Sequence, residues 1–330
     1  MATEAAPRTD ALIVYVPERL RDRAALWHDR PADARRRDAA RAAAEHDVLR
    51  LCEVTIAYVL LTSRQRAALS EHTIASYCAG VRSLLRWWTF ENLLHPSDNA
   101  GDRYMLQVSR DHRPATCSAR LTAAVLLYRA LRWCRATDAD PFAGVRPPQD
   151  RTPRHERRRP YTDDQIAAIA AASDERLRVL IYLCAHGGLR IAEAVALRWE
   201  DVQLSQGFLE VRHGKGDKHR TVHLSGTLRR ELTSWRELTR GSAGRLVLRS
   251  DGGPARDTTW LRRRLQDACQ RAGVAYLGWH AMRHTAGTRL ARESNNLQLV
   301  AAHLGHSDIS TTAIYAKWSQ NALREAITSW

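Results

Sequence analysis

A chain of 330 residues, 44% of them hydrophobic, is long enough to form one or two domains with sizeable cores. Its 51 Lys and Arg residues outnumber 36 acidic residues and give a net charge of +15, which favours binding to a polyanion such as nucleic acid, although a basic surface can also serve solubility alone. We expect a cytoplasmic protein without a membrane anchor, a zinc site or disulfides, because no apolar run has transmembrane length, no secretory signal begins the chain, and none of the 6 cysteines forms a Cys-x-x-Cys pair.

The first segment of the chain, residues 1–45, is interpreted as an N-terminal extension. Residues 31–45 are rich in Ala and Arg. A basic helix and a flexible arm both fit this composition, and the arginines suit either contact with DNA or simple solvation.

Residues 46–145 are predicted to form a helical domain. After Ser70, apolar side chains recur at spacings of three and four, which is typical of one helix face. The residues of this face are Ile74, Tyr77, Val81, Leu84, Leu85 and Trp88. Arg82 and Arg86 lie beside the face, four residues apart, and are candidates for contacts with DNA. A similar pattern predicts another amphipathic helix within residues 116–134.

A basic linker is predicted for residues 146–160. Pro147 and Pro148 stop a helix and keep the chain extended, and three consecutive arginines follow: Arg157, Arg158 and Arg159. This run suits a strap along DNA phosphates, with a solvated charge run as the alternative. Two lobes joined by such a linker could close around DNA.

A second domain with helices and a small sheet is predicted for residues 161–330. The sequence Thr-Asp-Asp-Gln at residues 162–165 predicts a helix start. Residues 208–212 and 220–224 alternate between apolar and polar side chains around a Gly-rich stretch, which indicates a β-hairpin. The remaining predicted helices lie at residues 177–184, 226–240 and 257–272 and around Arg283. The expected fold class is therefore mainly α with a small β-hairpin, in two lobes.

Five separated elements of this second domain carry side chains suited to chemistry. They are Gly-Gly-Leu-Arg-Ile-Ala-Glu at residues 187–193, Gly-Lys-Gly-Asp-Lys-His-Arg at 214–220, His-Ala-Met-Arg-His at 280–284, Leu-Gly-His at 304–306, and Tyr315. In this order and spacing they resemble the catalytic domain of the tyrosine recombinase (phage integrase) family over about residues 155–320. Thr73, Ile74 and Tyr77, followed by two tryptophans, resemble the core-binding domain of that family, which implies that the helical domain grips DNA.

The same residues suit cleavage of a phosphodiester without a metal, and the clustered Asp and Glu of a two-metal nuclease do not occur. Arg190 and Arg283 offer paired N–H donors that fit phosphate oxygens, although a surface ion pair of Arg190 with Glu193 is the simpler interpretation of that residue in isolation. His280 shares a helix face with Arg283 and could move a proton. His284 of the same motif, and His303 just before the Leu-Gly-His motif, are interpreted as structural.

Further roles are implied by the resemblance. Lys215 matches the lysine that protonates the leaving 5′ oxygen, with Lys218 as its competitor and a plain phosphate contact as the alternative. Tyr315 matches the nucleophile that forms a 3′-phosphotyrosyl bond, and this covalent bond removes the need for ATP. His306 would bind the scissile phosphate or hold the tyrosine. Glu193 matches the acidic position that orients the lysine and the histidine.

The resemblance also implies partners. It predicts an enzyme without metal or cofactor that is a monomer or dimer when free and acts as a tetramer on two DNA duplexes with inverted half-sites. The compact length looks most like a Xer-type recombinase, some of which work with a second recombinase. The alternatives are a mobile-element integrase, a type IB topoisomerase-like enzyme and a non-enzymatic DNA-binding regulator. An amphipathic tail, residues 321–330, would pack on its own domain or on a neighbouring subunit.

Overall fold

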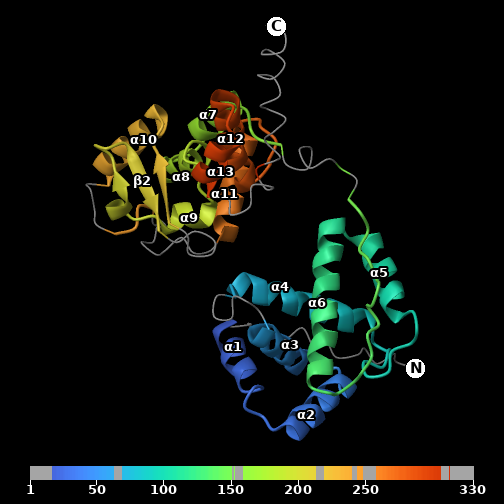
Figure 1. Cartoon of the computed structure of the whole chain (residues 1–330). Coiled ribbons are helices and arrows are strands. Elements are labelled where there is room, and N and C mark those ends of the chain that lie inside the picture. Colours follow the sequence, from blue (N-terminus) through green and yellow to red (C-terminus); the bar gives the residue numbers. More distant parts are fainter. Residues whose placement is uncertain are drawn as a thin grey trace, which may run out of the picture. The chain divides into compact units, whose positions relative to one another are not determined.

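The computed structural model describes residues 17–62, 69–150, 152, 159–212, 219–239, 244–247, 258–305 and 312. The chain divides into two compact units, Met1–Arg151 and Thr152–Trp330 (Figure 1). The division falls within the segment for which we predicted a linker. Among the described helices, none is both long enough and apolar enough to span a membrane.

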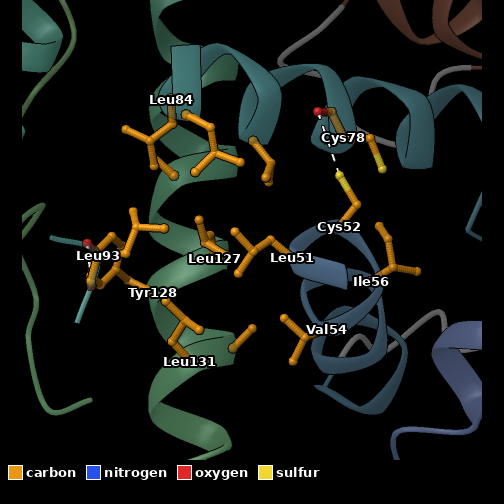
Figure 2. Close-up of a cluster of buried hydrophobic side chains, with 14 of the residues drawn as sticks. Leu51, Cys52, Val54, Ile56, Cys78, Leu84, Leu93, Leu127, Tyr128 and Leu131 are labelled. Atoms are coloured by element: carbon orange, nitrogen blue, oxygen red, sulfur yellow. Dashed lines mark hydrogen bonds between the residues drawn. The ribbon is translucent and has the colours of Figure 1, made fainter. Parts of the chain in front are cut away.

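The described part of the first unit is helical. Its helices are α1 (Pro17–Ala25), α2 (Ala32–Ala44), α3 (Val48–Thr62), α4 (Glu71–Trp87), α5 (Ala100–Asp111) and α6 (Pro114–Trp133). α4 and α6 approach closely because residue 80 is a glycine, where an added Cβ would lie 2.3 Å from the Cβ of Ala123. α3 packs on both helices. Figure 2 shows Leu51 of α3 and Leu127 of α6 pointing toward one another in the buried core.

Residues that we interpreted as an extension before residue 46 are part of this unit where the structure describes them. α2 corresponds to the helix alternative for residues 31–45, and three of its alanines are buried. α1 is attached to α3 through Glu53, a buried carboxylate that pairs with Arg23 at 2.6 Å. The indole of Trp27, which is fully buried, also donates to Glu53, at 3.4 Å. The composition of this segment gave no sign of these contacts, because they join residues about 30 positions apart.

The second unit combines helices with a small sheet, which confirms the predicted fold class. Its elements are α7 (Asp163–Ala171), α8 (Glu175–Ala185), α9 (Ile191–Ala196), the 3-10 helix η2 (Trp199–Asp201), β1 (Val202–Gln203), β2 (Phe208–Val211), β3 (Arg220–His223), α10 (Gly226–Leu238), α11 (Thr258–Arg271), α12 (Trp279–Ser294) and α13 (Leu297–Leu304). α8 is central, since it packs against α7, α9, α10 and α12 (Figure 1). The predicted start of α7 is confirmed by a capping box between Thr162 and Gln165.

The three strands form one antiparallel sheet in the order β1-β2-β3. β2 and β3 confirm the predicted hairpin, with Val211 opposite Arg220 where the strands meet the intervening loop. The loop residues 213–218 lie outside the described residues. β1 was not predicted, because a strand of 2 residues is too short to show alternation. The hairpin thus fixes the position of Arg220, next to the Gly-rich stretch that carries Lys215.

Candidate active site

Glu193 is the centre of the candidate site. It lies in the first turn of α9, and only 4% of its side chain is exposed. The turn between α8 and α9 depends on Gly188, which adopts a φ of +66°, a conformation that L side chains rarely take. An added Cβ there would also lie 2.7 Å from the Leu304 side chain. The two glycines before Arg190 therefore let the chain reverse and place Glu193 inside the unit.

Three arginines surround this carboxylate. Arg190 donates to it twice, from the backbone N–H at 2.9 Å and from Nη1 at 2.7 Å. Arg220 also donates twice, from Nη1 to Oε1 at 3.2 Å and from Nη2 to Oε2 at 2.7 Å. Nη1 of Arg283 lies 3.7 Å from Oε2. The ion pair of Arg190 with Glu193 therefore exists, but its carboxylate is buried among cations and is not a surface group.

The cations around Glu193 determine its protonation. Burial alone would raise the pKa of Glu193, but hydrogen bonds and charge from Arg220, followed by those from Arg190, outweigh burial and lower the pKa to about 2. Glu193 is consequently ionised at neutral pH. The cluster holds three guanidinium groups and one carboxylate, so it retains positive charge suited to an anion.

Arg283 is fixed by backbone carbonyls on two other elements. Its side chain is 2% exposed. Nη1 donates to the carbonyl of Gly188 at 2.7 Å, and Nη2 donates to the carbonyl of Leu304. These contacts bring together three of the motifs recognised in the sequence. A guanidinium held in this way is pre-organised and loses little freedom when it binds a phosphate.

His280 lies one helical turn before Arg283 on α12, and its side chain is exposed. Its ring contacts that of His284 edge to face, with centroids 4.6 Å apart and an interplanar angle of 83°. His284, which we interpreted as structural, is buried. His303 is half-buried, and its pKa is lowered to about 4, first by burial and then by the charge of Arg220.

Arg220 was not recognised from the sequence as a member of the site. It was the last residue of the motif at 214–220 and the first of an alternating strand, but no role was assigned to it, and its partner Glu193 lies 27 positions earlier. One residue in the sequence, Gly305, is related to the position of Arg220. Gly305 takes a φ of +66°, and an added Cβ there would lie 2.8 Å from Cδ of Arg220. The glycine of the Leu-Gly-His motif therefore indicates that another side chain passes close to the backbone at this point.

Comparison with known proteins identifies the family. The phage integrase family model matches residues 160–321. The tyrosine recombinase XerC of Pseudomonas fluorescens is 30% identical over 276 residues, which cover 76% of this chain and 87% of that protein. XerC of Xanthomonas campestris pv. campestris (strain B100) is 28% identical over 256 residues, covering 75% and 79% of the two chains. This chain belongs to the tyrosine recombinase family.

Solved structures show that this recombinase shares the fold of DNA-bound relatives. The XerH site-specific recombinase bound to its palindromic difH substrate matches with a TM-score of 0.65 at 18% identity, over 95% of this chain and 96% of that one. A lambda integrase tetramer bound to a Holliday junction matches with a TM-score of 0.66 at 16% identity, over 83% and 77% of the two chains. At these identities the similarity concerns the fold.

Several predicted site residues of the recombinase lie outside the described residues. They are Lys215, Lys218, His306, Tyr315, Arg157 and Arg158, and the C-terminal tail lies outside them too. The described candidates Arg82 and Arg86 are exposed on α4, and Arg159 is exposed after the division between the units. All six cysteines are buried. In the described ranges, no three His, Cys, Asp or Glu side chains are grouped so that they could hold a metal ion.

Proposed function

We propose that the cluster of Arg190, Glu193 and Arg283 is the phosphate-binding part of an active site that cleaves and rejoins DNA. The observation that carries the proposal is the arrangement of both arginines around one ionised carboxylate, in a chain of the tyrosine recombinase family. Glu193 accepts one hydrogen bond from the Arg190 backbone N–H and one from Nη1 of its guanidinium, which holds the guanidinium beside the carboxylate. Donors held in advance stabilise charge that develops on phosphate oxygens in the transition state.

In the proposed reaction, the phenolic oxygen of Tyr315 attacks the scissile phosphorus. The proton of the Tyr315 hydroxyl is transferred to a base, for which His280 is the candidate. The bond between phosphorus and the 5′ oxygen breaks, and Lys215 gives a proton to that oxygen. His306 binds the phosphate or holds the tyrosine. The product is a 3′-phosphotyrosyl bond and a free 5′ hydroxyl. A 5′ hydroxyl from a second strand reverses the same steps, so no external energy source is required.

The DNA partner and the assembly are inferred from relatives. XerH has been solved on a palindromic substrate and lambda integrase as a tetramer on a Holliday junction. By analogy, four copies of this chain would act on two duplexes with inverted half-sites, in the cytoplasm. The first unit would grip DNA through α4, which carries Arg82 and Arg86, and residues 146–160 would link it to the catalytic unit. The XerC relatives favour a Xer-like role in chromosome partition, alone or with a second recombinase.

Covalent-adduct capture in the host tests this function. The protein is recovered under denaturing conditions without crosslinker, and the attached DNA is sequenced, with Tyr315→Phe as the matched control. One dominant chromosomal site with inverted half-sites is the expected result for a Xer-like enzyme, whereas a mobile-element junction would indicate an integrase. Scattered adducts would instead favour a topoisomerase-like activity. Binding to DNA without any Tyr315-dependent adduct would favour a regulator and overturn the proposal.

A further inference from the structure

Arg220, the first residue of β3, is built into the candidate site without a part in the proposed reaction. Only 8% of its side chain is exposed. Its Nε donates to the carbonyl of His303 at 3.1 Å, and its two terminal nitrogens donate to Glu193. We propose that Arg220 is a positioning residue that occupies the carboxylate of Glu193 and so keeps Arg190 and Arg283 available for the phosphate. This inference rests on the proposed function.

Hydrogen bonds from two arginines saturate the carboxylate of Glu193. A carboxylate has about four lone-pair directions in which it accepts hydrogen bonds. Described residues fill four of them, two from Arg190 and two from Arg220. Nη1 of Arg283 lies 3.7 Å away, beyond hydrogen-bonding distance, and donates to the Gly188 carbonyl instead. Arg220 thus occupies the positions that would otherwise draw Arg283 onto the carboxylate.

Arg220 also keeps the net charge of the cluster positive. With Arg220 present, the cluster has three guanidinium groups and one carboxylate. Without Arg220, the charge of Glu193 would offset half of the positive charge on Arg190 and Arg283. An anion in this partly buried site would then be attracted less strongly, because low-dielectric surroundings strengthen such opposing charges. Arg220 therefore compensates for a carboxylate that is needed to orient Arg190 but opposes phosphate binding.

Arg220 also contacts the C-terminal end of α13. Arg220 binds the carbonyl of His303, and Arg283 binds the carbonyl of the next residue, Leu304. The C-terminal carbonyls of a helix lack partners within the helix and carry partial negative charge, so two arginines stabilise them well. Gly305 follows, and its missing side chain leaves room for Arg220. The guanidinium of Arg220, on β3, therefore connects this strand to Glu193 and to the end of α13, which precedes His306.

Single-turnover cleavage tests the inference. The probe is a nicked DNA duplex whose sequence is the one recovered by adduct capture. The full-length protein is added at a concentration that saturates the duplex. Arg220→Met should slow cleavage by about tenfold or more, because the two phosphate-binding arginines shift toward Glu193, while the affinity for the duplex changes by less than about twofold. Arg212→Met is the matched control. Arg212 also lies beside the hairpin loop and also pairs with a buried carboxylate, Asp201, at 2.5 Å, and its loss should leave the rate unchanged.

A double variant separates positioning from simple anchoring of β3. Removing the charge of Glu193 removes the competition that Arg220 suppresses, so Arg220→Met with Glu193→Gln should cleave faster than Arg220→Met alone. A double variant no faster than Arg220→Met, or a wild-type rate for Arg220→Met itself, would overturn the inference. If Arg220→Met does not fold, Arg220→Lys takes its place, since a lysine keeps the charge but cannot cover both oxygens. Failure of the wild-type protein to form any adduct would count against the proposed function instead.

Discussion

Nη1 of Arg283 lies 3.7 Å from Oε2 of Glu193, in a cluster where the two side chains are 2% and 4% exposed. At this distance the two charges attract one another without forming a hydrogen bond. The carboxylate is instead saturated by Arg190 and Arg220. This relationship determines what substitutions in the cluster should do to stability and to catalysis.

Glu193→Ala should lower the free energy of unfolding by about 3–5 kcal/mol, because it leaves buried arginines without their shared counter-ion. Denaturant unfolding measured by circular dichroism would give this value. Glu200→Ala is the matched control, since Glu200 also pairs with an arginine, Arg198, at 2.7 Å, but its side chain is 56% exposed. That loss should be below about 1 kcal/mol. Equal effects of the two substitutions would contradict the central role of Glu193.

Stability should fall between about pH 6.5 and pH 4 because two histidines are held neutral. His186 and His303 line one cavity of about 680 Å³. Burial, then the charge of Arg289 for His186 and of Arg220 for His303, lowers each pKa from 6.5 to about 4. The unfolded chain therefore binds more protons in this range, and the stabilisation present above pH 6.5 is lost as the pH falls.

Denaturant unfolding at a series of pH values checks this dependence. His303→Gln should give a shallower decline of the unfolding free energy between pH 6.5 and pH 4 than the wild-type protein, since the variant has one histidine fewer to protonate on unfolding. His72→Gln, at an exposed position of α4, controls for the loss of a histidine as such. An unchanged slope in His303→Gln would show that this histidine does not couple folding to pH.

Gly305→Ala should destabilise the protein more than Gly207→Ala. Both glycines have positive φ, +66° and +77°, so each alanine carries a backbone cost of roughly 1–2 kcal/mol. An added Cβ at residue 305 would also lie 2.8 Å from Cδ of Arg220, whereas no atom lies within 4 Å of one at residue 207. We expect roughly 1–3 kcal/mol of extra destabilisation from this crowding. Equal losses in thermal or denaturant unfolding would show that Arg220 moves aside without cost.

Much of the architecture of this chain could be predicted from its sequence, but the contacts of Glu193 with Arg220 at the centre of the candidate site could not. Periodicity and capping residues predicted several helices, among them α4, α6 and α7, and the β2–β3 hairpin, because those signals are local in sequence. Arg190 and Glu193 were also recognised, but because they are three positions apart in the sequence, the simplest interpretation of Arg190 by itself was an ion pair on the surface. Their burial depends on packing of α9 against distant elements. Arg220 escaped recognition because no local pattern reports a hydrogen bond across 27 positions.

The role proposed for Lys215 as the general acid gives a chemical prediction. Lys215→Ala should slow cleavage by about 10²–10⁴-fold, which is typical for loss of a general acid. A duplex with a 5′-bridging phosphorothiolate should restore the rate, because its sulfur leaves without needing a proton. Lys218→Ala is the matched comparison, because Lys218 is the competing lysine between β2 and β3. Absence of rescue in Lys215→Ala would indicate a phosphate contact, and rescue of Lys218→Ala alone would assign the role to Lys218.

The step at the centre of the proposed function is the attack of Tyr315 on the phosphate held by the arginine–glutamate cluster. Its most direct test is to digest the captured protein–DNA adduct with nuclease and protease and to identify the linked residue by mass spectrometry. We predict one modified peptide, with a nucleotide joined through its 3′ phosphate to the oxygen of Tyr315. A nucleotide on any other residue, or joined through a 5′ phosphate, would contradict the account.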